Sequence, residues 1–157
     1  MKAVEAALVH VERQAAVEHL QWVREQRQQA CAKLLDAHSA AEDALKRAAA
    51  VIRRGGSFPD AERDELTNHI FTLQSCTSQL ALWGPDEAVR LAQLLRAKTA
   101  EAAVALTQAQ HGVADAAGDL ELRWARWAEG SRAVTALRTS FLEFAGQVLR
   151  DPRQSST

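Results

Sequence analysis

Residues 106–148 read LTQAQHGVADAAGDLELRWARWAEGSRAVTALRTSFLEFAGQV and carry the strongest pattern in the chain. Apolar residues stand at every seventh position of this stretch: Leu106, Val113, Leu120, Trp127, Val134, Phe141 and Val148. A second apolar register lies three residues further along each heptad, interrupted by Arg123 and Gly130: Leu95, Ala102, Ala109, Ala116, Leu137 and Phe144. A repeat of this kind is typical of a coiled-coil seam and predicts one long helix over about residues 86–149.

The first third of the chain carries a looser form of the same pattern. Residues 1–54 contain neither glycine nor proline, which predicts a helix over about residues 3–54. Its apolar positions fall in two neighbouring registers, with Arg27 intruding: Leu20, Leu34, Ala41 and Ala48, and Val23, Ala30, Ala37, Ala44 and Val51. At about 1.5 Å per residue the two long helices span roughly 75 and 95 Å, so they can pair antiparallel along most of their length.

Glycine and proline divide the chain at two places. Gly55-Gly56 supplies the left-handed cap that ends many helices, and Pro59 or Asp60 can open a second helix over about residues 59–83. Gly84-Pro85 is a second stop, as a turn or as a kink. The fold class predicted is all-α: an antiparallel two-helix coiled-coil hairpin over residues 1–152 with a shorter middle helical segment, and a frayed tail at 153–157. Whether residues 60–83 pack on the rod or extend it stays open.

Composition agrees with thin helical packing. The chain has 32 alanines, no tyrosine and only eight Phe plus Trp, so it forms helices readily but fills a thick core poorly. A net charge of -1 and a pI of about 6.5 disfavour nucleic acid and membrane as partners. Cys31 and Cys76 are isolated and are expected to be reduced thiols. Without a signal peptide or an 18-residue apolar run, the expected location is cytoplasmic.

The residues that carry chemistry are scarce. Glu65 and His69 share a helix face, but a lone pair of this kind is more often solvated than bound to metal, and no di-iron, zinc or nucleophile motif is present. We therefore expect no enzyme activity, no cofactor, no metal and no small-molecule substrate.

The tryptophans and arginines allow more than one interpretation. Trp127 lies in the heptad register and is predicted to fill the seam, whereas Trp22 and Trp124 either pack on each other or anchor a partner. Trp83 and Phe58 either close their turns or are exposed contacts. The C-terminal arginines are predicted to form a solvated flank first, a contact for an acidic protein second, and a nucleic-acid site third: Arg123, Arg126, Arg132, Arg138, Arg150 and Arg153.

Three stretches together resemble the FliJ/YscO family of the bacterial type III export apparatus, including its Hrp-type members. They are the Gln/Arg-rich residues 22–31, the Gly-Gly-Ser-Phe-Pro break at 55–59 followed by a helix with Leu66, Ile70 and Leu73, and residues 122–127. The resemblance covers nearly the whole chain as a pattern. It departs from the family at Phe71, the aromatic residue of the middle segment, which stands one place off the apolar stripe.

This resemblance implies an antiparallel hairpin that acts as the central stalk of a hexameric secretion ATPase. It implies that the terminal residues Leu8, Val11, Arg138, Phe141 and Arg150 enter the ATPase ring. The segment with Leu66, Ile70 and Leu73 would contact the cytosolic domain of the export gate or secretion chaperones. The protein would be peripheral to membrane machinery.

Two other functions remain open from the sequence. A self-assembling coiled-coil scaffold or tether, and so a homo-oligomer, is favoured if the seam of the last helix is exposed in the monomer. A nucleic-acid or membrane adaptor is disfavoured by the net charge.

Overall fold

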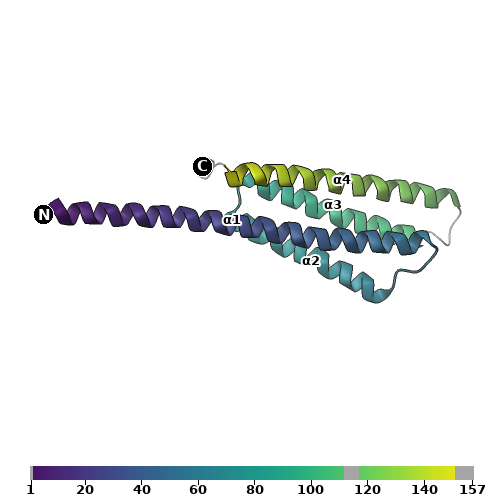
Figure 1. Cartoon of the computed structure of the whole chain (residues 1–157). Coiled ribbons are helices and arrows are strands. Elements are labelled where there is room, and N and C mark those ends of the chain that lie inside the picture. Colours follow the sequence, from purple (N-terminus) through teal and green to yellow (C-terminus); the bar gives the residue numbers. More distant parts are fainter. Residues whose placement is uncertain (1, 112–116, 151–157) are drawn as a thin grey trace.

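The computed structural model describes residues 2–111 and 117–150, with side chains for residues 9–110 and 121–148. It contains four helices: α1 (Lys2–Arg53), α2 (Asp60–Trp83), α3 (Asp86–His111) and α4 (Ala117–Arg150). No strand occurs among the described residues, so the all-α prediction is confirmed. The second half of α1 and the other three helices lie side by side, and the first half of α1 projects beyond them (Figure 1).

The turn after α1 follows from its two glycines. Gly55 has φ +76°, and its amide donates to the carbonyl of Ile52 while the Gly56 amide donates to that of Val51. This is the Schellman pattern, in which a left-handed glycine allows the last carbonyls of a helix to be hydrogen-bonded. The predicted glycine cap is confirmed, and Phe58 beyond it is buried, only 4% exposed.

Gly84-Pro85 forms a true turn, because α2 and α3 run in opposite directions on either side of it (Figure 1). The Gly84 amide donates to the carbonyl of Leu80 at 2.6 Å. A Cβ atom on Gly84 would lie 2.9 Å from that oxygen, so the close approach requires glycine.

The predicted single helix over 86–149 is wrong. The chain folds back, so that α3 and α4 lie against each other along much of their length (Figure 1). The break falls between His111 and Ala117, outside the described residues, where the sequence places Gly112, a poor helix former. Folding back covers the apolar face of α3 with that of α4. In a single unbroken helix, part of this apolar face would have no neighbouring helix to pack against.

The heptad positions form the core of this bundle. Leu34, Leu73, Leu80, Leu95 and Phe141 are all fully buried, and Leu106 and Val134 are nearly so. Two clusters result, one near the α2–α3 turn and one near the α1–α2 turn. Val113, Leu120 and Ala116 lie outside the residues with described side chains. Residues 60–83 pack on the bundle and do not extend a rod.

The four helices do not surround the core equally. α1 packs against α2 and α3 packs against α4, with further contacts of α3 to α1 and α2. α1 and α4 approach each other least among the helix pairs in contact. The side of the bundle between α1 and α4 is therefore the most open.

Candidate functional site

The most distinctive surface is the part of α1 that leaves the bundle, which we call the arm (residues 2–26). Apart from its base, which contacts the end of α2, it has no other described helix beside it (Figure 1). From Val9 to Gln29 every residue is exposed or half-buried, and Ala30 is the first buried residue among the described side chains of α1. At about 1.5 Å per residue the arm is roughly 37 Å long. Most of the arm therefore gains no support from tertiary packing, which is where most helical stability in proteins comes from.

Large apolar side chains on the arm are exposed. The exposed fractions are 46% for Val9, 62% for Val11, 64% for Val17, 59% for Leu20 and 44% for Trp22. Since a helix turns by 100° per residue, Val9, Leu20 and the half-buried Val23 share the face that continues into buried Ala30 and Leu34.

Other apolar residues of the arm lie on the opposite face. Val11 and Trp22 are turned by roughly 140–160° from Val9 at 100° per residue. A helix with apolar residues on opposite faces is suited to insertion between several neighbours.

The base of the arm is fastened to the end of α2. The ring of Trp22 meets the edge of Trp83 with centroids 5.1 Å apart, and His19 stacks on Trp22 at 6.0 Å. Arg27 Nε donates a 2.6 Å hydrogen bond to the carbonyl of Trp83, one of the carbonyls left over at the end of α2. Trp83 thus closes the turn and supports the arm.

The residues predicted to contact an export gate belong to the bundle. Leu66 is 5% exposed and Leu73 is fully buried, while Ile70 is half-buried against the cluster near the α1–α2 turn. The apolar stripe of α2 faces α1 and α3. Phe71, one place off this stripe, is 64% exposed. A partner can reach Phe71 on the folded bundle, but it cannot reach Leu73.

The residues predicted at the paired chain ends are not brought together. Val11 lies on the free arm, whereas Phe141 is fully buried in the core and Arg138 is half-buried. α4 ends beside the middle of α1, far from the tip of the arm (Figure 1). The side chains of Leu8 and Arg150 lie outside the described ones.

The remaining aromatic and charged candidates have local partners. Trp124 and Trp127 meet edge to face at 5.7 Å, with Arg53 of α1 over the Trp124 ring. Of the two alternatives for Trp22 and Trp124, mutual packing does not occur, because Trp22 packs on Trp83 and Trp124 on Trp127. An Oε1 of Glu65 lies 3.3 Å from Nε2 of His69 and forms an exposed ion pair at 3.2 Å with Arg47 of α1.

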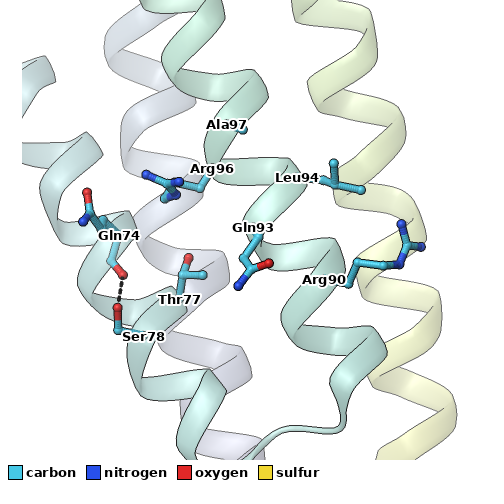
Figure 2. Close-up of a pocket in the computed structure, with 8 residues that line it drawn as sticks. All are labelled: Gln74, Thr77, Ser78, Arg90, Gln93, Leu94, Arg96 and Ala97. Carbon is cyan, nitrogen blue, oxygen red and sulfur yellow. Dashed lines mark hydrogen bonds between the residues drawn. The ribbon is translucent and has the colours of Figure 1, made fainter.

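A cleft of about 500 Å³ lies on the α2–α3 side of the bundle. Figure 2 shows Gln74, Thr77 and Gln93 pointing into the space between the helices, whereas Arg90 and Leu94 point toward α4. Several polar groups are already bound within their own helix: Thr77 donates to the carbonyl of Leu73, and Arg90 makes two hydrogen bonds to Glu87. The described residues that line the cleft include no histidine or carboxylate that could act as a general base.

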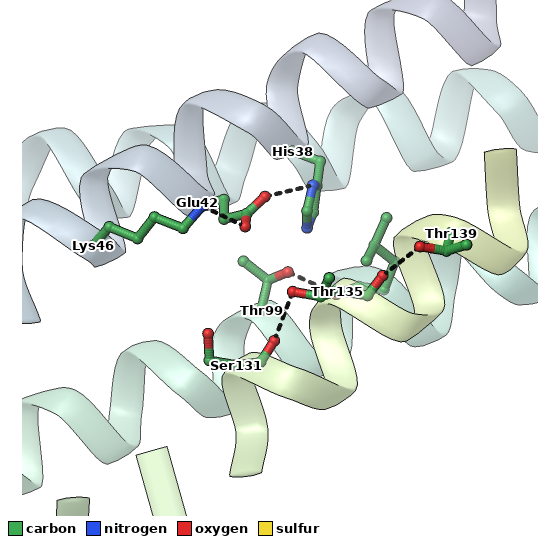
Figure 3. Close-up of polar contacts among 8 residues, drawn as sticks. His38, Glu42, Lys46, Thr99, Ser131, Thr135 and Thr139 are labelled. Carbon is green, nitrogen blue, oxygen red and sulfur yellow. Dashed lines mark hydrogen bonds and ion pairs between the residues drawn. The ribbon is translucent and has the colours of Figure 1, made fainter. Parts of the chain in front are cut away.

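Sequence reasoning missed a polar centre between α1, α3 and α4. His38 is fully buried, and neither ring nitrogen has a hydrogen-bond partner among the described residues. Glu42 lies 4.0 Å from Nδ1 and is bound to Lys46 at 2.7 Å, and the buried Thr99 and the half-buried Ser131 lie in the same region (Figure 3).

The surroundings of His38 favour its neutral form. Burial lowers the pKa of His38 below its usual 6.5, and the cations Arg138 and Lys46 lower it further, against the opposing effect of Glu42. Although burial raises the pKa of Glu42, its hydrogen bond and charge interaction with Lys46 lower it overall. A lone histidine at a heptad-flank position gives no sequence signal that would reveal this centre.

Comparisons with known proteins identify no relative: no family description, no curated protein and no solved structure matches this chain. Among the described residues, no three His, Cys, Asp or Glu side chains gather as a metal ion would need. None of the described helices combines the length and the apolar character needed to cross a bilayer.

Proposed function

We propose that this chain is a non-enzymatic component of a bacterial type III secretion or export apparatus. In this proposal it acts in the cytoplasm as the stalk of the export ATPase and contacts the export gate or secretion chaperones. The observation that supports the proposal most is the arm, a single helix with exposed apolar residues on opposite faces. A stalk inside a ring of subunits needs apolar contacts in several directions.

The proposal differs from the family expectation in one respect. The arm alone enters the ATPase ring, through Val9, Val11, Val17 and Leu20, because α4 ends beside the middle of α1. The bundle then stays outside the ring, where it offers exposed Phe71 to the gate or to a chaperone.

The test is reconstitution with the hexameric secretion ATPase of the same host. We expect the chain to co-elute with the ATPase and to change its rate of ATP hydrolysis. Leu20→Glu places a charge on an exposed position and removes apolar contact with a partner, so affinity should fall by about 10-fold or more. Val104→Glu, at a 56% exposed position on the bundle, is the matched control. An ATPase that neither binds the chain nor responds to it refutes the proposal.

The second candidate is a self-assembling scaffold. The apolar stripe through Val9, Leu20 and Val23 continues the face that is buried in the bundle, which favours pairing with the arm of a second copy. Light scattering after size exclusion separates the candidates. A monomer that binds the ATPase supports the stalk, and an oligomer that Leu20→Glu dissociates supports the scaffold.

A further inference from the structure

The open side of the bundle between α1 and α4 carries a groove with an unusual lining. We call it the α1–α4 groove; its volume is about 320 Å³. It is formed by Lys46, Ala49, Ala50 and Arg53 of α1, by Arg54 just after α1, and by Trp127 of α4. A smaller cavity of about 10 Å³ shares Lys46 and Trp127 with it and is also lined by Glu42 of α1 and by Ala102 of α3. The groove lies on the bundle, and the inference drawn from it does not depend on the proposed function.

The shape of the groove fits a helix. α1 and α4 approach each other least among the contacting helix pairs, so a further helix can lie along the line between them. The floor is made of Ala49 and Ala50, whose small side chains leave room for larger ones on the incoming helix. One wall is the half-buried ring of Trp127, a flat apolar surface of the kind that anchors partners.

The charge of the groove selects an acidic occupant. Three of the six residues that line it are basic, and none of the six is acidic. Lys46 binds Glu42 from the neighbouring turn. Arg53 pairs with no carboxylate among the described side chains, and its guanidinium lies 5.0 Å from the centre of the Trp124 ring. A partner with carboxylates beside an apolar residue would meet Arg53 and Arg54 at the rim and Trp127 inside.

A protein segment fits this charge better than nucleic acid does. Contact with a polyanionic backbone needs an extended basic surface, whereas this chain has a net charge of -1 and three cations at the groove. We infer that the α1–α4 groove is a docking site for an acidic amphipathic helix of a partner protein, with an apolar residue on Ala49, Ala50 and Trp127 and carboxylates on Arg53 and Arg54.

The test uses the full chain and a synthetic helical peptide with leucine on one face and glutamate on the others. Binding is followed by the indole N–H signals of the four tryptophans in heteronuclear NMR. Trp124 and Trp127 lie at the groove, whereas Trp22 and Trp83 form a pair at the base of the arm and report binding elsewhere. We expect the first two signals to shift and the second two to stay unchanged, with affinity falling as salt is raised.

Matched variants separate the groove from general charge. Arg53→Ala with Arg54→Ala should weaken peptide binding by about 10-fold or more. Arg47→Ala with Arg90→Ala removes two exposed arginines that pair with Glu65 and Glu87 outside the groove, and should leave affinity unchanged. Circular dichroism confirms that each variant is folded.

Several results overturn the inference. One is that the wild-type chain does not bind the peptide at millimolar concentration. Another is that the two double variants bind it with the same affinity. A third is that the signals of Trp22 and Trp83 shift as much as those of Trp124 and Trp127. Tighter binding of the lysine version of the peptide, or of a single-stranded oligonucleotide, also overturns it. If the Arg53/Arg54 variant is unfolded, the salt dependence and the tryptophan signals of the wild-type chain decide alone.

Discussion

Replacing the buried histidine of the polar centre should stabilise the protein. His38 is fully buried, and its two ring nitrogens have no partner among the described residues. An unsatisfied buried polar group costs about 1–3 kcal/mol, and a swap of similar volume costs less than about 1.5 kcal/mol. His38→Leu should therefore raise the free energy of unfolding by about 1–2 kcal/mol, or the Tm by roughly 3–6 °C for a chain of this size.

The pH dependence of the free energy of unfolding is a second, independent test of the buried His38. Because the pKa of His38 in the folded state lies below its ordinary value of 6.5, the unfolded chain binds more protons than the folded chain just below that pH. The stability of the wild-type protein is thus complete above pH 6.5 and falls as the pH drops toward the folded-state pKa. His38→Leu should lose this part of the pH dependence and keep that of the carboxylates, such as Glu42, at lower pH.

The measurement is urea unfolding, followed by circular dichroism at pH 7.5 and pH 5.5. His69→Leu is the control, because His69 is partly exposed and its pair with Glu65 contributes about 0.2–1 kcal/mol at most. A His38→Leu protein that is less stable than wild type at pH 7.5 would show that the ring makes favourable interactions. An unchanged slope between the two pH values would show that His38 does not titrate as its burial requires.

Three further changes test the turn, the core and the thiols. Gly84→Ala brings a Cβ to 2.9 Å from the carbonyl oxygen of Leu80 and should lower the free energy of unfolding in urea by about 1–3 kcal/mol; an unchanged midpoint would show that the turn relaxes without cost. Phe141→Ala removes a fully buried ring and should lower it by about 3–5 kcal/mol, visible as a lower Tm, and a loss below 1 kcal/mol would contradict the core assignment. Burial raises the pKa of both thiols, and Cys31 is the more buried, so a disulfide reagent at pH 7.5 should modify Cys76 first and Cys31 only in urea.

Much of the local structure could be predicted from the sequence. Glycine and proline act through the backbone alone, so Gly55-Gly56 and Gly84-Pro85 mark the two helix ends whatever the tertiary structure. The heptads likewise identify core residues such as Leu34, Leu95 and Leu106, because burial on one helix face has the same period in a hairpin and in a bundle.

The fold-back within residues 86–149 could not be predicted from that period. A seven-residue repeat is compatible with one long helix paired to a partner and with two shorter helices paired to each other. The choice depends on which arrangement buries more apolar area, and Val134 and Phe141 find their neighbours only after the chain reverses. Gly112 stands between the two helices in the sequence, but one glycine does not by itself distinguish the two arrangements.

The candidate site is harder to predict from the sequence than the fold. An apolar stripe such as Leu66, Ile70 and Leu73 has the same spacing whether it meets another helix of the chain or another protein, so the sequence cannot assign it to one or the other. The arm is recognised only because three helices stop short of it (Figure 1). The α1–α4 groove combines residues about 75 positions apart, and that proximity exists only in the folded chain.

The arm and the core part of α1 belong to one helix with neither glycine nor proline in residues 1–54. Their rotational phase is therefore locked: each residue added between Arg27 and Ala30 would turn the arm by 100° and advance it by about 1.5 Å relative to the bundle. A one-residue insertion would swing the Val9–Leu20 stripe a quarter of a turn away from its present direction. A seven-residue insertion would return it almost to the original direction while moving it outward by about 10 Å. Direction and reach of the arm are thus separate quantities, and the number of residues at its base sets both.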